Sequence, residues 1–321
     1  MTQHDKGEVP PTVSIGMPTY NCEKFIREAI DSLLRQTFID FELIISDNAS
    51  IDGTEAICRE YAANDSRIRY IQQKENLGAV ANFQFVLDEA IGEYFMWAAS
   101  DDRCEPAFIE RLLAVFKEDQ DIVLAMSDVN NISESGSYLG VSKLENIRID
   151  DVKKYWKRIR PLFFENPTSQ IFFSIYGVFR TAVLRQISLD YFGLVRYASG
   201  SEIPLLAQVA TKGKIVSIPD DLKDYRRHSN SVYFQEQRSS NLWMRLRNLC
   251  NISTCLIKIA IRSELPAVDK LRAMVAIFRT GSYKIFGFLL RRLLQALLCN
   301  QLKGLQTLSD DVPPRRPVVD R

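Results

Sequence analysis

The sequence has few of the residues that mark several specialised classes of protein. It contains two histidines, and its six cysteines form no C-x-x-C pair, so a soft-metal site built from these side chains is not indicated. Glycine and proline, with 14 and 12 copies among 321 residues, are too scarce for a fibrous or low-complexity chain. Because 46% of the residues are hydrophobic, the chain has enough apolar side chains to form a sizeable core. We therefore expect a globular enzyme or binding protein, with the reduced thiols typical of the cytoplasm.

Long hydrophobic runs are also missing. Residues 1–12 are polar and lack the apolar core of about 7 to 15 residues that a signal peptide needs. The longest apolar stretch, 285–298, is interrupted by Arg291 and Arg292 and is shorter than the roughly 20 residues that span a bilayer. The sequence thus predicts a cytoplasmic protein with a flexible N-terminus over residues 1–12 and no transmembrane helix.

The charge is balanced over the whole chain but unevenly distributed. A net charge of +1 argues against recruitment to nucleic acid, and no nucleic-acid partner is expected. Residues 241–321 hold 14 Lys/Arg against 5 Asp/Glu, whereas residues 1–240 hold 27 against 35. Two interpretations of the basic helical extension, residues 241–308, stay open. Its helices either pack on the main domain or form a basic amphipathic surface that binds an anionic membrane on its inner face. Residues 309–321 form a tail.

The hydrophobic pattern predicts an α/β fold with a mostly parallel sheet, because short apolar runs alternate with amphipathic stretches from residue 13 onward. Strands are expected at 13–17, 41–45, 67–71, 94–97, 121–126 and 214–218. Helices are expected at 23–36, 79–91 and 202–210. Two further helices are expected, one that begins after a capping box formed by Asp52 and Glu55, and one that begins near Pro106. Residues 127–200 are rich in aromatic side chains and have no clear assignment, and residues 225–231 are expected to form a loop.

Three polar clusters follow predicted strands. They are residues 18–21, residues 47–54, and Ser100-Asp101-Asp102. In an open parallel sheet the carboxyl ends of the strands bind ligands, since loops converge there and helix amides point outward. Each cluster alone is better explained as a turn or a helix cap. Their joint placement at one edge of the sheet favours a ligand site.

The adjacent carboxylates of Asp101 and Asp102 indicate a hard divalent cation. Like charges a few ångströms apart repel each other, so two such groups make better sense as ligands of Mg²⁺ or Mn²⁺. A cation held by few protein carboxylates keeps positions open for phosphate oxygens. This combination suits a nucleoside diphosphate whose base lies near Tyr20 and Asp47.

The ordered series of these motifs resembles the family 2 glycosyltransferases of the GT-A fold. The matching segments are 13–21, 32–37, 47–54, Asn76-Leu77-Gly78, Gly92-Glu93-Tyr94, and Ser100-Asp101-Asp102 with Pro106. They cover residues 12–126 densely and 200–231 more loosely. The resemblance implies a Rossmann-like sheet flanked by helices, with a C-terminal helical extension, and an inverting enzyme that uses a nucleotide-sugar donor.

The resemblance also implies roles for individual residues of the donor site. The residues expected to bind the donor are Pro18, Thr19, Tyr20, Asp47, Asn76, Asp101, Arg226 and Arg227. Tyr20 would stack on the base, and Arg226 or Arg227 would neutralise the leaving diphosphate. Asp102 would ligate the metal. His228 would complete the metal shell, although a lone histidine in a basic loop is as readily only solvated.

Two positions depart from the family pattern. Many relatives carry an additional Asp where this chain has Ala99, and Asn48 replaces a frequent second Asp. The metal cluster therefore has one carboxylate fewer, which leaves its affinity open.

The family supplies its catalytic base as an Asp or Glu at the start of a late helix, and Glu202 fits that place. The alternative is that Glu202 only stabilises the first turn of its helix, an effect of about 0.3 to 1 kcal/mol. General-base catalysis needs a carboxylate near the cleft, and the other candidates, Asp190 and Glu165, match no motif. We therefore expect Glu202 to deprotonate the acceptor.

Together these features predict an inverting, metal-dependent glycosyltransferase that transfers a sugar to a hydroxyl of a glycan or lipid-linked acceptor in surface polysaccharide synthesis. Residues 13–126 would form the nucleotide-sugar-binding half, and residues 127–240 the acceptor-binding and catalytic half. Two alternatives stay open. A nucleotidyltransferase would release pyrophosphate, and a catalytically silent, membrane-associated subunit would bind a nucleotide-sugar without turnover.

Overall fold

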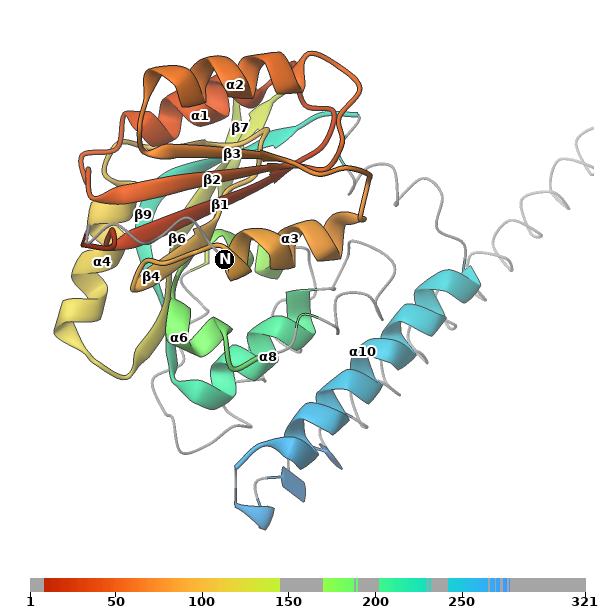
Figure 1. The fold of residues 1–321 in the computed structure, drawn as a ribbon. Helices are drawn as coiled ribbons and strands as arrows, with labels where there is room; N and C mark the ends of the chain where they lie inside the picture. Colours follow the sequence, from red (N-terminus) through yellow and green to blue (C-terminus); the bar gives the residue numbers. More distant parts are fainter. Residues whose placement is uncertain are drawn as a thin grey trace, which may run out of the picture.

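The structure, a computed structural model, describes residues 9–144, 170–187, 189, 202–229, 231, 242–264, 266–268, 270–271, 274–275 and 277. Over this part of the chain the fold is α/β, with one curled mixed sheet between layers of helices (Figure 1). The expected α/β class is confirmed. Asp190, Glu165, residues 281–308 and the tail at 309–321 lie outside the described residues.

The first half of the sheet is parallel. Its strands are β1 (Val13–Thr19), β2 (Phe41–Asp47), β3 (Ile68–Gln72) and β4 (Tyr94–Trp97), in the order β3-β2-β1-β4. The connecting helices are α1 (Ile26–Leu34), α2 (Thr54–Asn64) and α3 (Ala79–Asp88), and α4 (Phe108–Glu118) follows β4. In Figure 1, α1 and α2 lie on one side of these strands and α3 on the other. The chain turns from β2 and β3 on one side of β1 to β4 on its other side, and such a switch point is where α/β sheets bind ligands.

The second half of the sheet is mixed. Its strands are β5 (Arg103–Cys104), β6 (Ile122–Ser133), β7 (Tyr138–Ser142), β8 (Val178–Arg180) and β9 (Lys214–Arg227). β6 and β9 run parallel to each other, while β8 is antiparallel to both β4 and β6, β5 is antiparallel to β9, and β7 is antiparallel to β6. The remaining described helices are η2 (Gln170–Tyr176), α6 (Thr181–Leu184), α8 (Glu202–Lys212) and α10 (Leu242–Arg262).

The strands β1, β2, β4 and β6 are buried on both faces, and alternate residues serve different cores. Val13 and Ile15 of β1 pack with α1 and α4, whereas Phe95 and Trp97 of β4 pack with α3 and α8. Because successive strand side chains point to opposite faces, each continuous apolar run supplies two cores at once. These runs gave the clearest strand signal in the sequence.

Gly92 allows β1 to approach the turn before β4 closely. A Cβ atom at this position would lie 2.6 Å from the backbone nitrogen of Ser14. The backbone N–H of Gly92 donates to the Ser14 hydroxyl at 2.8 Å. Only glycine fits here without a shift of backbone, which accounts for the glycine of the Gly92-Glu93-Tyr94 motif.

Two strands are longer than the hydrophobic pattern predicts by seven residues or more. The expected strand 121–126 extends to Ser133, and the expected strand 214–218 extends to Arg227. Residues 225–227, expected to begin a loop, therefore belong to β9. The extension is stable because β6 and β9 pair along their length and the polar side chains find partners, such as Arg103 Nη2 at 2.8 Å from Asp224 Oδ2.

The expected capping box at the start of α2 is also wrong. The residue before the helix is Gly53, which has no side chain to cap the helix. The Asp52 carboxylate instead accepts the backbone N–H groups of Thr54 at 3.0 Å and Glu23 at 3.1 Å. Glu55 pairs with Arg59 one turn further along the helix, so its side chain does not reach back to the cap.

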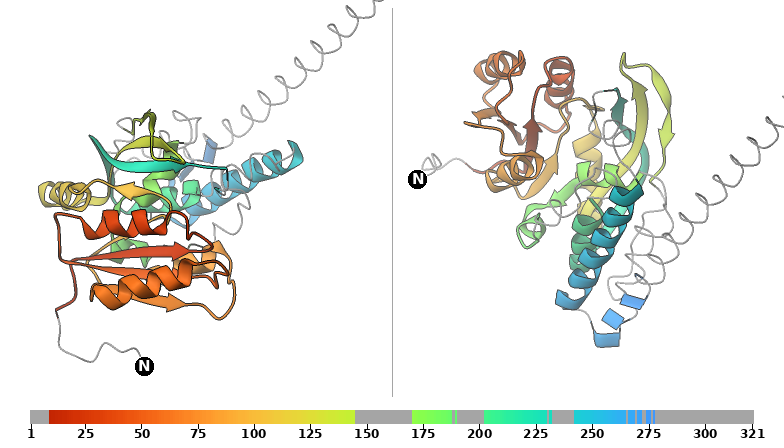
Figure 2. Two further views of the ribbon diagram at one scale, coloured as in Figure 1. Left: turned by 90° about the horizontal axis from the view of Figure 1, so that it is seen from above. Right: turned by 90° about the vertical axis from the view of Figure 1, so that its right-hand side faces the viewer.

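The C-terminal helix α10 lies alongside α8 (Figure 2). Ala207 of α8 packs in one apolar cluster with Ile252, Leu256 and Ile259 of α10. The described part of the basic extension thus packs on the main domain. Across the described residues, no helix combines the length and the hydropathy needed to cross a bilayer.

Candidate active site

A cleft of about 360 Å³ opens at the carboxyl ends of β1 and β4. The predicted site residues that line it are Pro18, Tyr20, Asp101, Asp102, Glu202 and His228. They come from the end of β1 and the loop after it, the turn after β4, the first residue of α8 and the segment after β9. Segments far apart in the sequence therefore bring an exposed aromatic ring, two adjacent carboxylates, a third carboxylate and an imidazole to one cleft.

The carboxylate of Asp102 is held from two directions. Its Oδ1 accepts the backbone N–H of Arg226 at 3.0 Å, and its Oδ2 lies 3.4 Å from the Lys223 Nζ. Both side chains are buried, with 4% of Asp102 and 2% of Lys223 exposed. Burial raises the pKa of the Asp102 carboxyl to about 6, with the Lys223 charge acting in the opposite direction. The acidic turn is thus built around a buried ion pair.

Asp101 pairs with the histidine. The His228 Nε2 and Asp101 Oδ2 are 2.9 Å apart, and the His228 ring packs against Phe25 with centroids 4.8 Å apart. The structure thus brings His228 to the acidic turn. Its contact there is with the Asp101 carboxylate.

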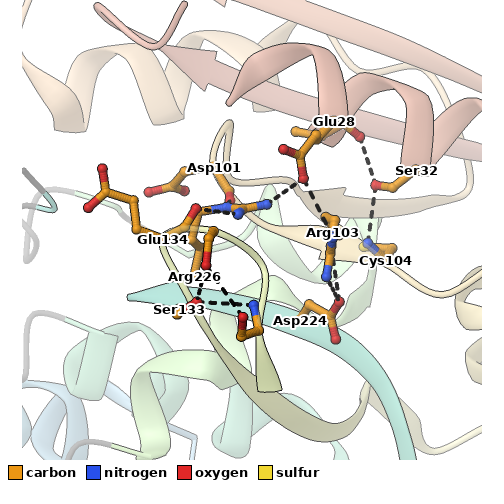
Figure 3. A network of polar contacts seen from close by, with 12 residues as sticks. Glu28, Ser32, Asp101, Arg103, Cys104, Ser133, Glu134, Asp224 and Arg226 are labelled. Atoms are coloured by element: carbon orange, nitrogen blue, oxygen red, sulfur yellow. Dashed lines mark hydrogen bonds and ion pairs between the residues drawn. The ribbon is translucent and has the colours of Figure 1, made fainter. Parts of the chain in front are cut away.

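Arg226 is buried beneath the acidic turn, with 1% of its surface exposed. Its Nε donates to the Asp101 carbonyl at 2.9 Å, its Nη1 to the Glu134 carbonyl at 2.9 Å, and its Nη2 to the Glu28 carboxylate at 2.7 Å (Figure 3). With its donors directed to protein oxygens, Arg226 fixes the position of the Asp101-Asp102 turn and does not line the cleft.

Arg227 points elsewhere. Its Nε and Nη2 donate to the Asn131 side-chain oxygen of β6, at 3.0 and 2.8 Å. The residue is exposed and is absent from the cleft wall. Neither predicted arginine therefore faces the cleft in this structure.

Of the residues predicted to hold the base and ribose, Tyr20 is the most accessible. Its side chain is 47% exposed beside the cleft, an arrangement suited to stacking. Asp47 is fully buried, and its oxygens accept the Ser50 backbone N–H at 2.9 Å and the Tyr70 hydroxyl at 2.8 Å. Asp47 therefore shapes the loop after β2 and does not line the cleft.

Thr19 and Asn76 do not line the cleft either; Thr19 is buried, whereas Asn76 is exposed. The Thr19 hydroxyl contacts the Cys22 thiol, which does line the cleft. The Asn76 side-chain oxygen accepts the Asn48 amide at 3.0 Å and the Gly78 backbone N–H at 2.9 Å. Asn48 thus joins the loop after β2 to the turn before α3.

Glu202 is the first residue of α8, and 7% of its surface is exposed. It lines the same cleft as Asp101 and Asp102. The helix behind it is anchored by buried Leu205 and Leu206 in the core shared with β4 and α3. A carboxylate is thus presented to the cleft from a rigid helix.

Sequence reasoning missed several residues of the site. Phe25, Phe83, Tyr176 and Tyr225 line the cleft, and Lys223 lies behind Asp102. Phe25 and Phe83 were read only as core positions of helices. Tyr176 falls in the aromatic segment that had no assignment, and a lysine within a polar run gave no sign of burial.

The expected Mg²⁺ or Mn²⁺ can be tested against the side chains at the acidic turn. Within the described ranges, no group of three or more His, Cys, Asp and Glu side chains is arranged to hold a metal ion. Asp102 Oδ2 is nevertheless a buried oxygen whose contact among the described residues is the Lys223 ammonium at 3.4 Å, without a well-aligned hydrogen bond, and its residue lines the cleft. One such oxygen fits a cation that takes its other ligands from phosphates and water.

A family model described as glycosyl transferase family 2 matches residues 14–187, more than half of the chain. The chain belongs to this family. An uncharacterized glycosyltransferase of Methanocaldococcus jannaschii, MJ1057, is 35% identical over 148 residues, which is 46% of this chain and 51% of the relative. The chain thus spans about half the length of that relative.

Solved structures of similar fold bind nucleotides. TarS of S. aureus in complex with UDP-GlcNAc has a TM-score of 0.60 at 18% identity, covering 84% of this chain and 72% of TarS. The mannosyltransferase PcManGT of Pyrobaculum calidifontis, in complex with GDP-Man and Mn²⁺, has a TM-score of 0.53 at 15% identity, covering 90% of this chain and 81% of PcManGT. At such identities the likeness establishes the fold, and the expected GT-A fold is confirmed.

Proposed function

We propose that this member of glycosyl transferase family 2 is an inverting glycosyltransferase, which moves a sugar from a nucleoside-diphosphate donor to a hydroxyl of a glycan or lipid-linked acceptor. The observation that carries the proposal is the single cleft shared by Tyr20, the Asp101-Asp102 turn and Glu202. Such a cleft offers a stacking surface for the base, acidic groups near the diphosphate and a separate carboxylate for the acceptor. Inversion follows from a single displacement, for which one base is enough.

In this proposal Glu202 accepts the proton of the acceptor hydroxyl while that oxygen attacks the anomeric carbon of the donor sugar. Tyr20 stacks on the base, with Pro18 beside it, and Asp101 approaches the ribose. Arg226 acts on the donor site through the turn it holds. Residues 13–126 then form the donor half of the domain and residues 127–240 the acceptor half.

The proposed cofactor is Mn²⁺ or Mg²⁺, held on the protein side by Asp102 and with His228 nearby. When bound, it would supply positive charge to the departing diphosphate. Asp102 Oδ2, which has an ion-pair contact but no well-aligned hydrogen bond, supports this assignment, as does the Mn²⁺ named with PcManGT. Surface polysaccharide synthesis, a cytoplasmic location and binding of the basic extension to an anionic membrane stay predictions.

The base assignment is tested with Glu202→Gln. We expect the rate of sugar transfer to fall by about 10²- to 10⁴-fold, because that is the usual contribution of a general base, while donor affinity stays unchanged. The donors to test are UDP- and GDP-sugars, the kinds bound by the structural neighbours. Nucleoside diphosphate release gives the rate, and calorimetric titration of UDP and GDP gives the affinity.

Glu110→Gln is the matched control, because Glu110 also lies in the first turn of a helix but is exposed and does not line the cleft. Near-normal turnover by Glu202→Gln would remove this residue as the base. Release of pyrophosphate in place of nucleoside diphosphate would favour a nucleotidyltransferase, and donor binding without any product would favour a silent binding subunit.

A further inference from the structure

Lys223 is a buried cation that the proposed reaction does not use. Its Nζ lies 3.4 Å from Asp102 Oδ2 and 4.8 Å from the centre of the Tyr176 ring. Both partners line the cleft, and Lys223 itself does not, so its charge sits directly behind the cleft wall.

Packing alone does not account for a charge at this position. Its register partners on the neighbouring strands are Cys104 of β5 and Val129 of β6, which are both apolar and buried. An apolar side chain would suit these neighbours, whereas an ammonium ion is costly to bury unless it is paired. The role of this lysine therefore lies in the effect of its positive charge on the Asp102 carboxylate.

The positive charge competes with a metal ion for the same oxygen. The Lys223 Nζ and the Asp102 carboxylate form an ion pair at 3.4 Å in which both side chains are buried. A lysine buried beside a carboxylate in this way is an ammonium ion. A divalent cation on Asp102 Oδ2 would lie within a few ångströms of it, where like charges repel strongly in a poorly solvated site.

We infer that Lys223 is a built-in counter-cation of the acidic turn, which disfavours a divalent cation in the empty cleft and attracts the diphosphate before any cation is bound. The diphosphate brings several negative charges, and these offset the repulsion between Lys223 and the metal. The donor would then bind to the cleft before the cation or together with it. This inference rests on the proposed function, because it requires a nucleoside diphosphate to occupy the cleft.

Two affinities must change in opposite directions when the charge is removed. In Lys223→Gln, which keeps a hydrogen-bond donor for Asp102, we expect Mn²⁺ to bind the nucleotide-free protein about tenfold tighter or more. The same variant should bind UDP and GDP more weakly, by about threefold or more, when EDTA removes all metal. Electron paramagnetic resonance of free Mn²⁺ gives the first affinity and calorimetry the second, both on the full chain.

The controls separate charge from structure. Lys223→Arg keeps the charge and should bind Mn²⁺ like the wild type. Lys214→Gln removes a lysine from the same strand, β9, where its partner is Asp119 at 2.6 Å, far from the cleft wall, and should change neither affinity. Lys223→Met is a second neutral variant, suited to the apolar neighbours if the glutamine fails to fold.

Unchanged or weaker Mn²⁺ binding by a folded neutral variant would overturn the inference. If the wild type binds Mn²⁺ in the presence of UDP or GDP, and the neutral variants have the same affinities for Mn²⁺ and for the nucleotides as the wild type, only the inference is wrong. If no form of the protein binds Mn²⁺ with either nucleotide, both the inference and the cation of the proposed function are wrong.

Discussion

At the scale of single residues, burial decides how side chains of one type behave. Cys58 and Cys104 are buried in the core around α1 and α4, whereas Cys250 is exposed on α10. Burial raises the pKa of the Cys104 thiol to about 11 and also raises that of Cys58. Since the thiolate is the reactive form, these two groups are doubly protected, by their inaccessibility and by their protonation.

Alkylation should therefore discriminate between these cysteines. With iodoacetamide at pH 8, we expect Cys250 to be modified quickly and Cys58 and Cys104 to react only when the protein is unfolded in urea. Peptide mass spectrometry of timed samples measures this. Equal labelling of Cys104 and Cys250 in the native protein would contradict the buried position of Cys104.

The sequence allowed the site to be predicted as far as its local motifs reach. Pro18, Tyr20, Asp101 and Asp102 lie at or just after the ends of strands that apolar runs identify, so their convergence could be expected. The direction of the Arg226 side chain could not, because it depends on Glu28 and on the Glu134 carbonyl, which lie in distant segments. A motif places a residue near a site but does not fix which atoms it meets.

At the scale of secondary structure elements, close contacts between backbones impose the strictest limits. At Gly92, an added Cβ would meet the backbone of β1, which cannot move without disturbing the parallel sheet. We expect Gly92→Ala to lower the free energy of unfolding by about 1 to 3 kcal/mol, the usual cost of overpacking. Urea denaturation measures the loss.

Gly53→Ala provides a comparison for this substitution. Its Cβ would meet the end of the Glu23 side chain, a flexible carboxylate that can move away. We expect a smaller loss of stability than for Gly92→Ala. A loss as large at Gly53 would show that the clash with backbone is not the reason for the effect at Gly92.

The ends of β6 and β9 show where element prediction stops. Strands flanked by helices were predicted within a few residues of their ends, since their apolar runs need no knowledge of partners. The polar second half of β9 was not predicted, because its charged residues are stabilised by partners that are distant in the sequence. Asp220 pairs with Arg111, Asp224 with Arg103, and Lys223 with Asp102. Charges in a strand are indistinguishable from a solvated loop until these partners are known.

At the scale of the whole molecule, α10 supports the helix that carries Glu202. Leu256 is fully buried in the cluster that joins α10 to Ala207 of α8. We expect Leu256→Ala to lower the free energy of unfolding by about 2 to 4 kcal/mol, with the denaturant dependence unchanged if the two helices unfold together. Urea denaturation followed by circular dichroism measures both quantities.

Ile261→Ala is the control for this variant. Ile261 lies on the same helix, but 54% of its side chain is exposed. Its removal should change the stability by no more than about 0.5 kcal/mol. Equal effects of the two substitutions would mean that α10 gains little from packing against α8.

The buried guanidinium of Arg226 has a mechanical consequence. It belongs to β9 and binds α1 through Glu28, the turn between β6 and β7 through the Glu134 carbonyl, and the acidic turn through the Asp101 carbonyl. These segments come from both the first and the second half of the domain. A motion that separated these segments would have to break three hydrogen bonds of a buried guanidinium, so we expect the acidic turn to keep its position relative to them whenever the cleft opens or closes.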